Sequence, residues 1–139
     1  VLDAQLAAIN SIKPGADVHM PHKIACDIIQ QGLENLGLLA PGESLSKFYM
    51  HGTGHWLGMD VHDVGIYQVN KQHRVFEKGM VITVEPGIYI RKDDKINPIY
   101  HDIGIRIEDD VLVTNTGNTV LTEQLAKTID EIETLMSED

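Results

Sequence analysis

Apolar residues recur at helical spacing in three segments of the chain, two near its beginning and one near its end. A spacing of three or four positions collects such residues on one face of a helix. The first pattern stops at Pro14 and Gly15, which terminate helices, and it starts with the first residue. We therefore expect the chain to open on the end of a helix and to be a piece of something longer. The predicted helices cover residues 1–12, 20–36 and 122–136.

Strand patterns dominate the second half of the chain. A short apolar run ends at Pro86, and a later segment alternates isoleucine with other residues, which places Arg106 and Glu108 on one face of a strand. Asp109 and Asp110 favour a turn that leads into a returning strand. Helices followed by antiparallel strands and a terminal helix define an α+β fold. The strands are predicted at residues 80–84, 88–90, 103–107 and 111–113.

The composition is that of a globular protein with an acidic surface. With 139 residues, 42% of them hydrophobic and 23% charged, the chain is long enough for one domain with a hydrophobic core. Eleven basic and 21 acidic residues give a formal charge of -10 without a basic patch, so we expect no nucleic-acid or membrane partner. The single cysteine, Cys26, cannot form an internal disulfide, which favours a reducing, cytoplasmic location.

Three of the seven histidines fall within twelve positions, in a segment rich in glycine. His51 and His55 have the spacing of a zinc-binding helix, but Gly52 and Gly54 between them would each cost such a helix about 1 kcal/mol. We therefore expect a loop that directs each histidine independently. The alternative is an ordinary group of surface or hydrogen-bonded core histidines, which would include His62.

Two glutamates lie at the ends of strand patterns. Glu85 follows a strongly apolar run, and a carboxylate buried there would need a cation or hydrogen-bond donors. Glu108 follows the alternating segment, two residues after Arg106. The alternatives are that Glu85 points to solvent and that Glu108 forms a surface pair with Arg106. With one histidine, the two glutamates make a ligand set that suits manganese, cobalt, zinc or iron, which indicates metal-assisted hydrolysis or a structural metal.

Three segments of the chain match the motifs of one known family. Residues 51–63, 79–89 and 104–110 resemble motifs of the pita-bread metallopeptidases, and most closely those of the Xaa-Pro aminopeptidases (aminopeptidase P). The resemblance extends over essentially the whole chain. It implies the C-terminal portion of a pita-bread fold, with helices packed on a curved antiparallel sheet. Residues 1–139 would then be the C-terminal part of the catalytic domain, without its N-terminal half or the domain that precedes it.

The same resemblance implies a reaction and a role for each candidate residue. The reaction removes the N-terminal residue from a peptide whose second residue is proline, so the expected partner is a peptide substrate. His51 and His62 would position this substrate and stabilise the tetrahedral intermediate or assist proton transfer. Glu85 would help to activate water, Arg106 would support the carboxylates, and Glu108 would bridge two ions, most often manganese, with zinc, cobalt or iron as other choices. The implied metal ligands are His55, Glu85 and Glu108.

The sequence departs from the family pattern in its ligand set. The family's site has two further ligands, both aspartates on a hairpin that would precede this sequence. Asp17 follows a turn and Asp27 lies in a predicted helix, so we do not expect either to replace them, and we expect the isolated chain to be inactive. Two alternatives stay open: prolidase, which cleaves Xaa-Pro dipeptides, and a non-catalytic binding module of the same fold. The sequence also leaves the oligomeric state open, and a homo-oligomer is one of the states that it allows.

Overall fold

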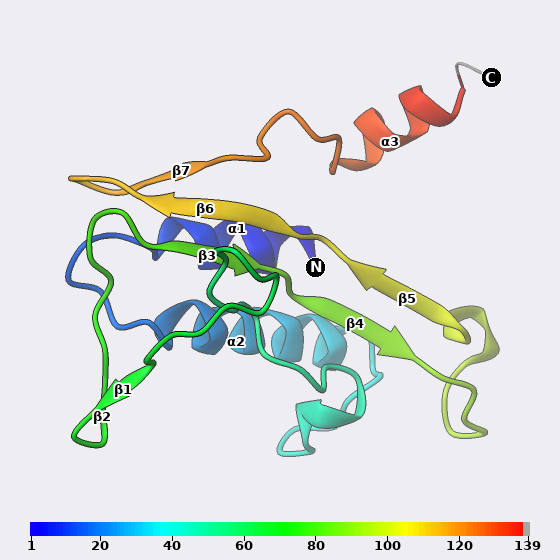
Figure 1. Ribbon diagram of the computed structural model, residues 1–139. Helices are drawn as coiled ribbons and strands as arrows, with labels where there is room; N and C mark the ends of the chain where they lie inside the picture. The colour runs from blue at the N-terminus through cyan, green and yellow to red at the C-terminus, as the bar shows by residue number, and fades with distance from the viewer. Residues whose placement is uncertain (138–139) are drawn as a thin grey trace.

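The computed structural model describes residues 1–137 and confirms the expected α+β architecture (Figure 1). Helices α1 (Leu2–Asn10) and α2 (Met20–Asn35) lie against each other, and α1 passes behind the central strands. Both helices match the predicted ones to within about two residues at each end. Ala8 of α1 and Ala25 of α2 have no exposed surface, and such small side chains let helices pack closely.

The sheet is built from two long segments, each made of two consecutive strands with a short break between them. The strands are β3 (Val81–Val84), β4 (Gly87–Ile90), β5 (Ile103–Arg106), β6 (Asp109–Val113) and β7 (Asn118–Val120). β3 pairs with β6, β4 pairs with β5, and β7 adds to the other edge of β6, all antiparallel. In Figure 1, β3 runs on into β4 and β5 runs on into β6.

One register runs through both halves of this ladder. Val84 of β3 pairs with Asp109 of β6, and the pairing of Gly87 with the last residue of β5 continues the same numbering. The residues in the break therefore stand opposite one another, and Glu85 faces Glu108. Since a slip of one residue would turn every side chain to the other face, the register decides which side chains meet at the break.

The predicted turn at Asp109 and Asp110 is wrong. Both residues begin β6, and Asp109 is almost fully buried. Its carboxylate accepts hydrogen bonds from the side chains of Gln5, Thr122 and Lys127. Because these partners compensate the buried charge, an aspartate can begin a buried strand here.

The third helix is shorter than predicted. Helix α3 (Ile129–Met136) begins after Thr128, whose hydroxyl accepts the N–H of Glu131 while the Glu131 carboxylate accepts the N–H of Thr128. Residues 122–128 form turns and irregular backbone, although their apolar positions continue the helical spacing. Within residues 1–137, no helix is both long and apolar enough to cross a membrane. The remaining elements, which the sequence patterns did not predict, are β1 (Gln68–Val69), β2 (Gln72–His73), η1 (Leu45–Lys47) and η2 (Pro98–Tyr100).

Candidate metal centre

Residues 53–57 run along the edge of β3 that faces away from β6, and this pairing positions His55. A side chain at Gly54 is impossible here, because a Cβ would lie 2.0 Å from the carbonyl oxygen of Thr83. The segment is therefore held at backbone distance from β3, and it brings His55 to the end of the strand that Glu85 follows. The backbone hydrogen bonds run from Glu85 N–H to the Thr53 carbonyl (2.6 Å), from Thr83 N–H to the His55 carbonyl (3.0 Å) and from Leu57 N–H to the Val81 carbonyl (3.2 Å).

Three of the predicted site residues converge at the break in the sheet. His55, Glu85 and Glu108 each offer one ligand atom, and these atoms all lie within 4.8 Å of one another. Nδ1–H of His55 donates to the carbonyl of Trp56 at 3.1 Å, which leaves Nε2, 3.2 Å from Oε1 of Glu85, as the nitrogen that can ligate a metal. A backbone partner on one ring nitrogen is the usual arrangement for a histidine that ligates a metal through the other.

The two carboxylates of this group repel each other. Glu85 is 9% exposed, and the ladder register sets it opposite Glu108, where like charges destabilise a sheet. Burial, and then the charge of Glu85, raise the pKa of Glu108. A divalent cation would relieve this repulsion. Two carboxylate oxygens and one imidazole nitrogen fit manganese, zinc, cobalt or iron(II), so the donor set is chemically suited to the metal that the sequence implies.

His51 and Arg106 meet through a tyrosine to which the sequence motifs assigned no role. Nε–H of Arg106 donates to the hydroxyl oxygen of Tyr89 at 2.7 Å, and this hydroxyl donates to Nε2 of His51 at 2.9 Å. Nδ1–H of His51 donates in turn to the carbonyl of Gly52 at 2.7 Å. Arg106 also lies 3.4 Å from Oε2 of Glu85, so this chain ends on the candidate metal ligands. The position of Tyr89, four residues after Glu85 in the same motif, was the available signal.

His62 reaches the centre from an exposed loop. Its ring meets the ring of His55 edge to face, with 4.3 Å between the centroids. Asp63 fixes the loop, because its N–H donates to the carbonyl of Trp56 at 3.0 Å and its carboxylate accepts the N–H of Met59 at 2.8 Å. The structure thus brings all the predicted site residues of this chain to one place.

Asp17 and Asp27 lie outside this group, as expected from the sequence. The carboxylate of Asp17 lies 3.1 Å from Nδ1 of His73, and that of Asp27 lies 2.6 Å from Nζ of Lys23. Among residues 1–137, no other set of three histidine, cysteine or acidic side chains has ligand atoms as close together as the group around His55.

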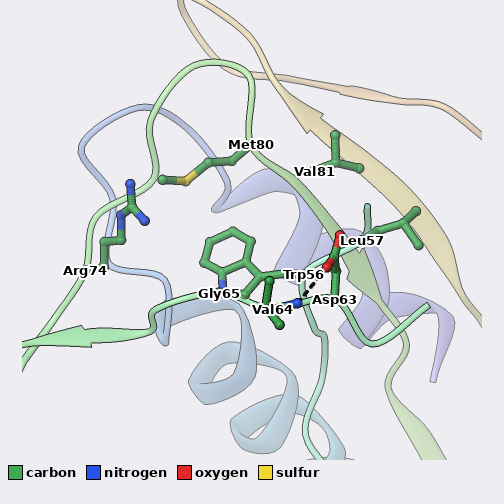
Figure 2. Close-up of a pocket in the computed structure, with 8 residues that line it drawn as sticks. All are labelled: Trp56, Leu57, Asp63, Val64, Gly65, Arg74, Met80 and Val81. Atoms are coloured by element: carbon green, nitrogen blue, oxygen red, sulfur yellow. Dashed lines mark hydrogen bonds between the residues drawn. The ribbon is translucent and has the colours of Figure 1, made fainter. Parts of the chain in front are cut away.

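The loop that carries His62 packs on Trp56 through a glycine. Figure 2 shows Gly65 against the indole, beside a hollow of about 240 Å³. A Cβ on Gly65 would lie 1.9 Å from Cδ1 of Trp56, and Trp56 is itself only 7% exposed.

Gly65→Ala is therefore expected to lower the free energy of unfolding by about 1–3 kcal/mol, which urea titration would measure. The control is Gly117→Ala, where a Cβ meets nothing within 4 Å and the expected change is below about 0.5 kcal/mol. Equal effects would contradict this account of the loop.

Comparison with known proteins now identifies the family. The model of metallopeptidase family M24 matches residues 1–115. An Xaa-Pro aminopeptidase of Haemophilus influenzae is 47% identical over 144 residues, which cover 99% of this chain and 33% of that protein. The structure of aminopeptidase PepP from Pseudomonas aeruginosa superposes with a TM-score of 0.96 at 48% identity, and aminopeptidase P from Escherichia coli with the inhibitor Pro-Leu superposes at 0.91 and 41%. Both structural matches cover 99% of this chain and 33% of the other.

The α+β fold, with one imidazole and two carboxylates gathered at the middle of an antiparallel sheet, agrees with these matches. The chain belongs to metallopeptidase family M24, and its architecture is that of the pita-bread fold, as the sequence motifs indicated. It spans about a third of the length of the relatives that it matches.

Proposed function

We propose that this chain forms the C-terminal part of the catalytic domain of an Xaa-Pro aminopeptidase. Such an enzyme is a metal-dependent hydrolase that removes the N-terminal residue from peptides with proline in second position. The observation that carries the proposal is the convergence of His55, Glu85 and Glu108 in a chain that is 47% identical to an Xaa-Pro aminopeptidase. The Escherichia coli relative was solved with the inhibitor Pro-Leu, which supports a proline-containing peptide as the substrate.

The proposed cofactor is a pair of divalent ions, with manganese as the first choice. Oxygen ligands outnumber nitrogen in the group, which favours manganese over zinc, cobalt or iron. When bound, such an ion supplies a Lewis acid for the peptide carbonyl and a more acidic water. Glu108 would hold the metal together with Glu85 and His55, since the register places it opposite Glu85 and within reach of His55.

The other residues of the centre have separate proposed roles in substrate binding and proton transfer. Arg106 holds one oxygen of Glu85, and we propose that the Glu85 carboxylate accepts the proton of the attacking water. Both ring nitrogens of His51 form hydrogen bonds, one with the carbonyl of Gly52 and one with the hydroxyl of Tyr89. His51 therefore orients Tyr89, and we propose that it positions the substrate through this tyrosine. The ring of His62 contacts His55 from an exposed loop, which suits it to donate a hydrogen bond to the substrate carbonyl in the transition state.

A large apolar groove supports the proposal that residues 1–139 are one part of a larger catalytic domain. The groove has a volume of about 740 Å³ and is lined by side chains of α1, α2, β4, β5 and α3. Leu36, Ile105 and Ile129 in its wall are each about half exposed or more. Apolar patches of this kind mark surfaces that other protein covers. We propose that the rest of the catalytic domain packs here.

A cytoplasmic location is proposed on the chemistry of the one cysteine. Cys26 is a free thiol on α2, and burial raises its pKa. A free, half-buried thiol that makes no disulfide is typical of proteins in reducing compartments.

The test is an assay of the full-length protein that the gene encodes, stripped of metal by a chelator and then loaded with Mn²⁺. We expect metal-dependent release of the N-terminal residue from the tripeptide Ala-Pro-Ala and none from Ala-Ala-Ala. Cleavage of the dipeptide Ala-Pro alone would identify a prolidase. Failure to bind Mn²⁺ would contradict the enzyme proposal and favour a binding module.

A further inference from the structure

Thr53 joins helix α2 to the candidate metal centre. It is 2% exposed, and its hydroxyl oxygen lies 2.8 Å from Nδ1 of His22 and 2.5 Å from the hydroxyl of Tyr49. Its backbone carbonyl accepts the N–H of Glu85 at 2.6 Å. Two residues further on, after Gly54, the chain reaches His55. A displacement of Thr53 would therefore move His55, and it would also move the carbonyl group that binds the N–H of Glu85.

His22 and Tyr49 can hold Thr53 as neutral groups. Burial lowers the pKa of His22 and raises the pKa of Tyr49 to about 12, so near pH 7 the imidazole is uncharged and the phenol keeps its proton. A neutral imidazole has one donor and one acceptor nitrogen. Nδ1 of His22 lies 2.8 Å from the hydroxyl oxygen of Thr53, and Sγ of Cys26 lies 3.6 Å from Nε2 and 3.9 Å from Nδ1.

The loop segment is closely packed against β3 and borders a hollow next to His22. Toward β3 it is stopped, because the backbone at Gly54 already touches the carbonyl of Thr83. A hollow of about 270 Å³ adjoins the segment, and its lining includes His22, Thr53 and Thr83. The contact between His22 and Thr53 therefore lies at this hollow, on the segment that Glu85 N–H joins to β3.

We propose that His22 is a positioning residue for the metal centre, acting through Thr53 on the placement of His55 and Glu85. Its hydrogen-bond partners are Thr53 and Cys26, neither of which is a candidate ligand. The inference rests on the proposed function for its catalytic consequence, but its effect on metal binding does not depend on which peptide is cleaved. Partners of this kind, one shell outside the ligands, typically change metal affinity or activity by about 10-fold or more when removed.

Two amide substitutions at His22 distinguish the roles of its two ring nitrogens. The side-chain nitrogen of asparagine is two bonds from Cβ, as Nδ1 is, whereas that of glutamine is three bonds away, as Nε2 is. His22→Asn can thus keep the bond to Thr53, and His22→Gln can keep only the contact with Cys26. In the full-length protein we expect His22→Gln to lower Mn²⁺ affinity and kcat by about 10-fold with KM unchanged, and His22→Asn to stay within about 2-fold of wild type. Calorimetric titration of the metal-free protein and steady-state kinetics measure the two effects.

Thr53→Val supplies the partner test, since valine keeps the branched shape and removes the hydroxyl. It is expected to reproduce His22→Gln, and the double variant should be no worse than either single variant. The inference is overturned if His22→Gln binds Mn²⁺ like wild type, or if His22→Asn loses as much as His22→Gln. If the wild-type protein binds Mn²⁺ but does not cleave Xaa-Pro peptides, the proposed function fails while the binding titrations still decide the role of His22.

Discussion

His55→Ala is expected to lower kcat/KM of the full-length protein for Ala-Pro-Ala by more than about 100-fold and to weaken Mn²⁺ binding to a similar degree. The size follows because loss of a ligand should exceed the loss of an outer partner, which reaches about 100-fold. The imidazole is the single nitrogen donor of the three-residue group. Without it, Glu85 and Glu108 stay opposed across the ladder with one fewer ligand to hold the cation that relieves them. Steady-state kinetics and Mn²⁺ titration of the metal-free protein measure both effects.

His73→Ala is the matched control for this prediction. His73 also pairs with a carboxylate, since its Nδ1 lies 3.1 Å from Oδ2 of Asp17, but it lies outside the candidate metal group. As a surface change it is expected to alter activity by less than about 2-fold, in line with an effect below about 0.5 kcal/mol. Full activity of His55→Ala would show that His55 is not a metal ligand. An equal loss in both variants would point to misfolding instead of a lost ligand.

The sequence predicted the residues of the candidate site, but not how these residues are arranged around it. Histidines in a glycine-rich loop and glutamates after apolar strands indicated a metal site, because burying such groups needs a cation or hydrogen-bond partners. The sequence patterns did not show that Glu85 and Glu108 face each other, since this follows from a register set by the pairing of whole strands. The role of Thr53 was also missed, because its partner His22 lies 31 residues away on a helix.

The two errors in the fold have different origins. Asp109 and Asp110 have the local preference for a turn, yet the contacts of Asp109 with Gln5 and Lys127 span 104 and 18 residues and override it. The third helix was predicted too long because apolar spacing continues upstream of its start. The hydrogen bonds of Thr128 and Glu131 mark the true beginning, a signature that is readable in the sequence but that the apolar pattern does not contain.

Asp109→Asn is expected to lower the free energy of unfolding by about 3–5 kcal/mol, the range for breaking one side of a buried ion pair. The side chain of Asp109 is 1% exposed and that of Lys127 is 15% exposed, and Nζ of Lys127 donates to both carboxylate oxygens at 2.8 and 2.9 Å. A neutral amide would leave the buried ammonium without its counter-charge and would weaken the hydrogen bond that Gln5 donates at 2.6 Å. Since whole domains are stable by only about 5–15 kcal/mol, urea titration should resolve this loss easily.

Asp110→Asn is the control, because Asp110 is the next residue of β6 and its side chain points to the opposite, less buried face. Its expected effect is below about 0.5 kcal/mol. Lys127→Met combined with Asp109→Asn removes both charges, so the double variant should lose clearly less than the sum of the two single changes. Additive losses would show that the two charges do not stabilise each other, and that Thr122 and Gln5 are the partners that stabilise the Asp109 carboxylate. An Asp109→Asn protein as stable as Asp110→Asn would show that the buried carboxylate makes no net contribution to the fold.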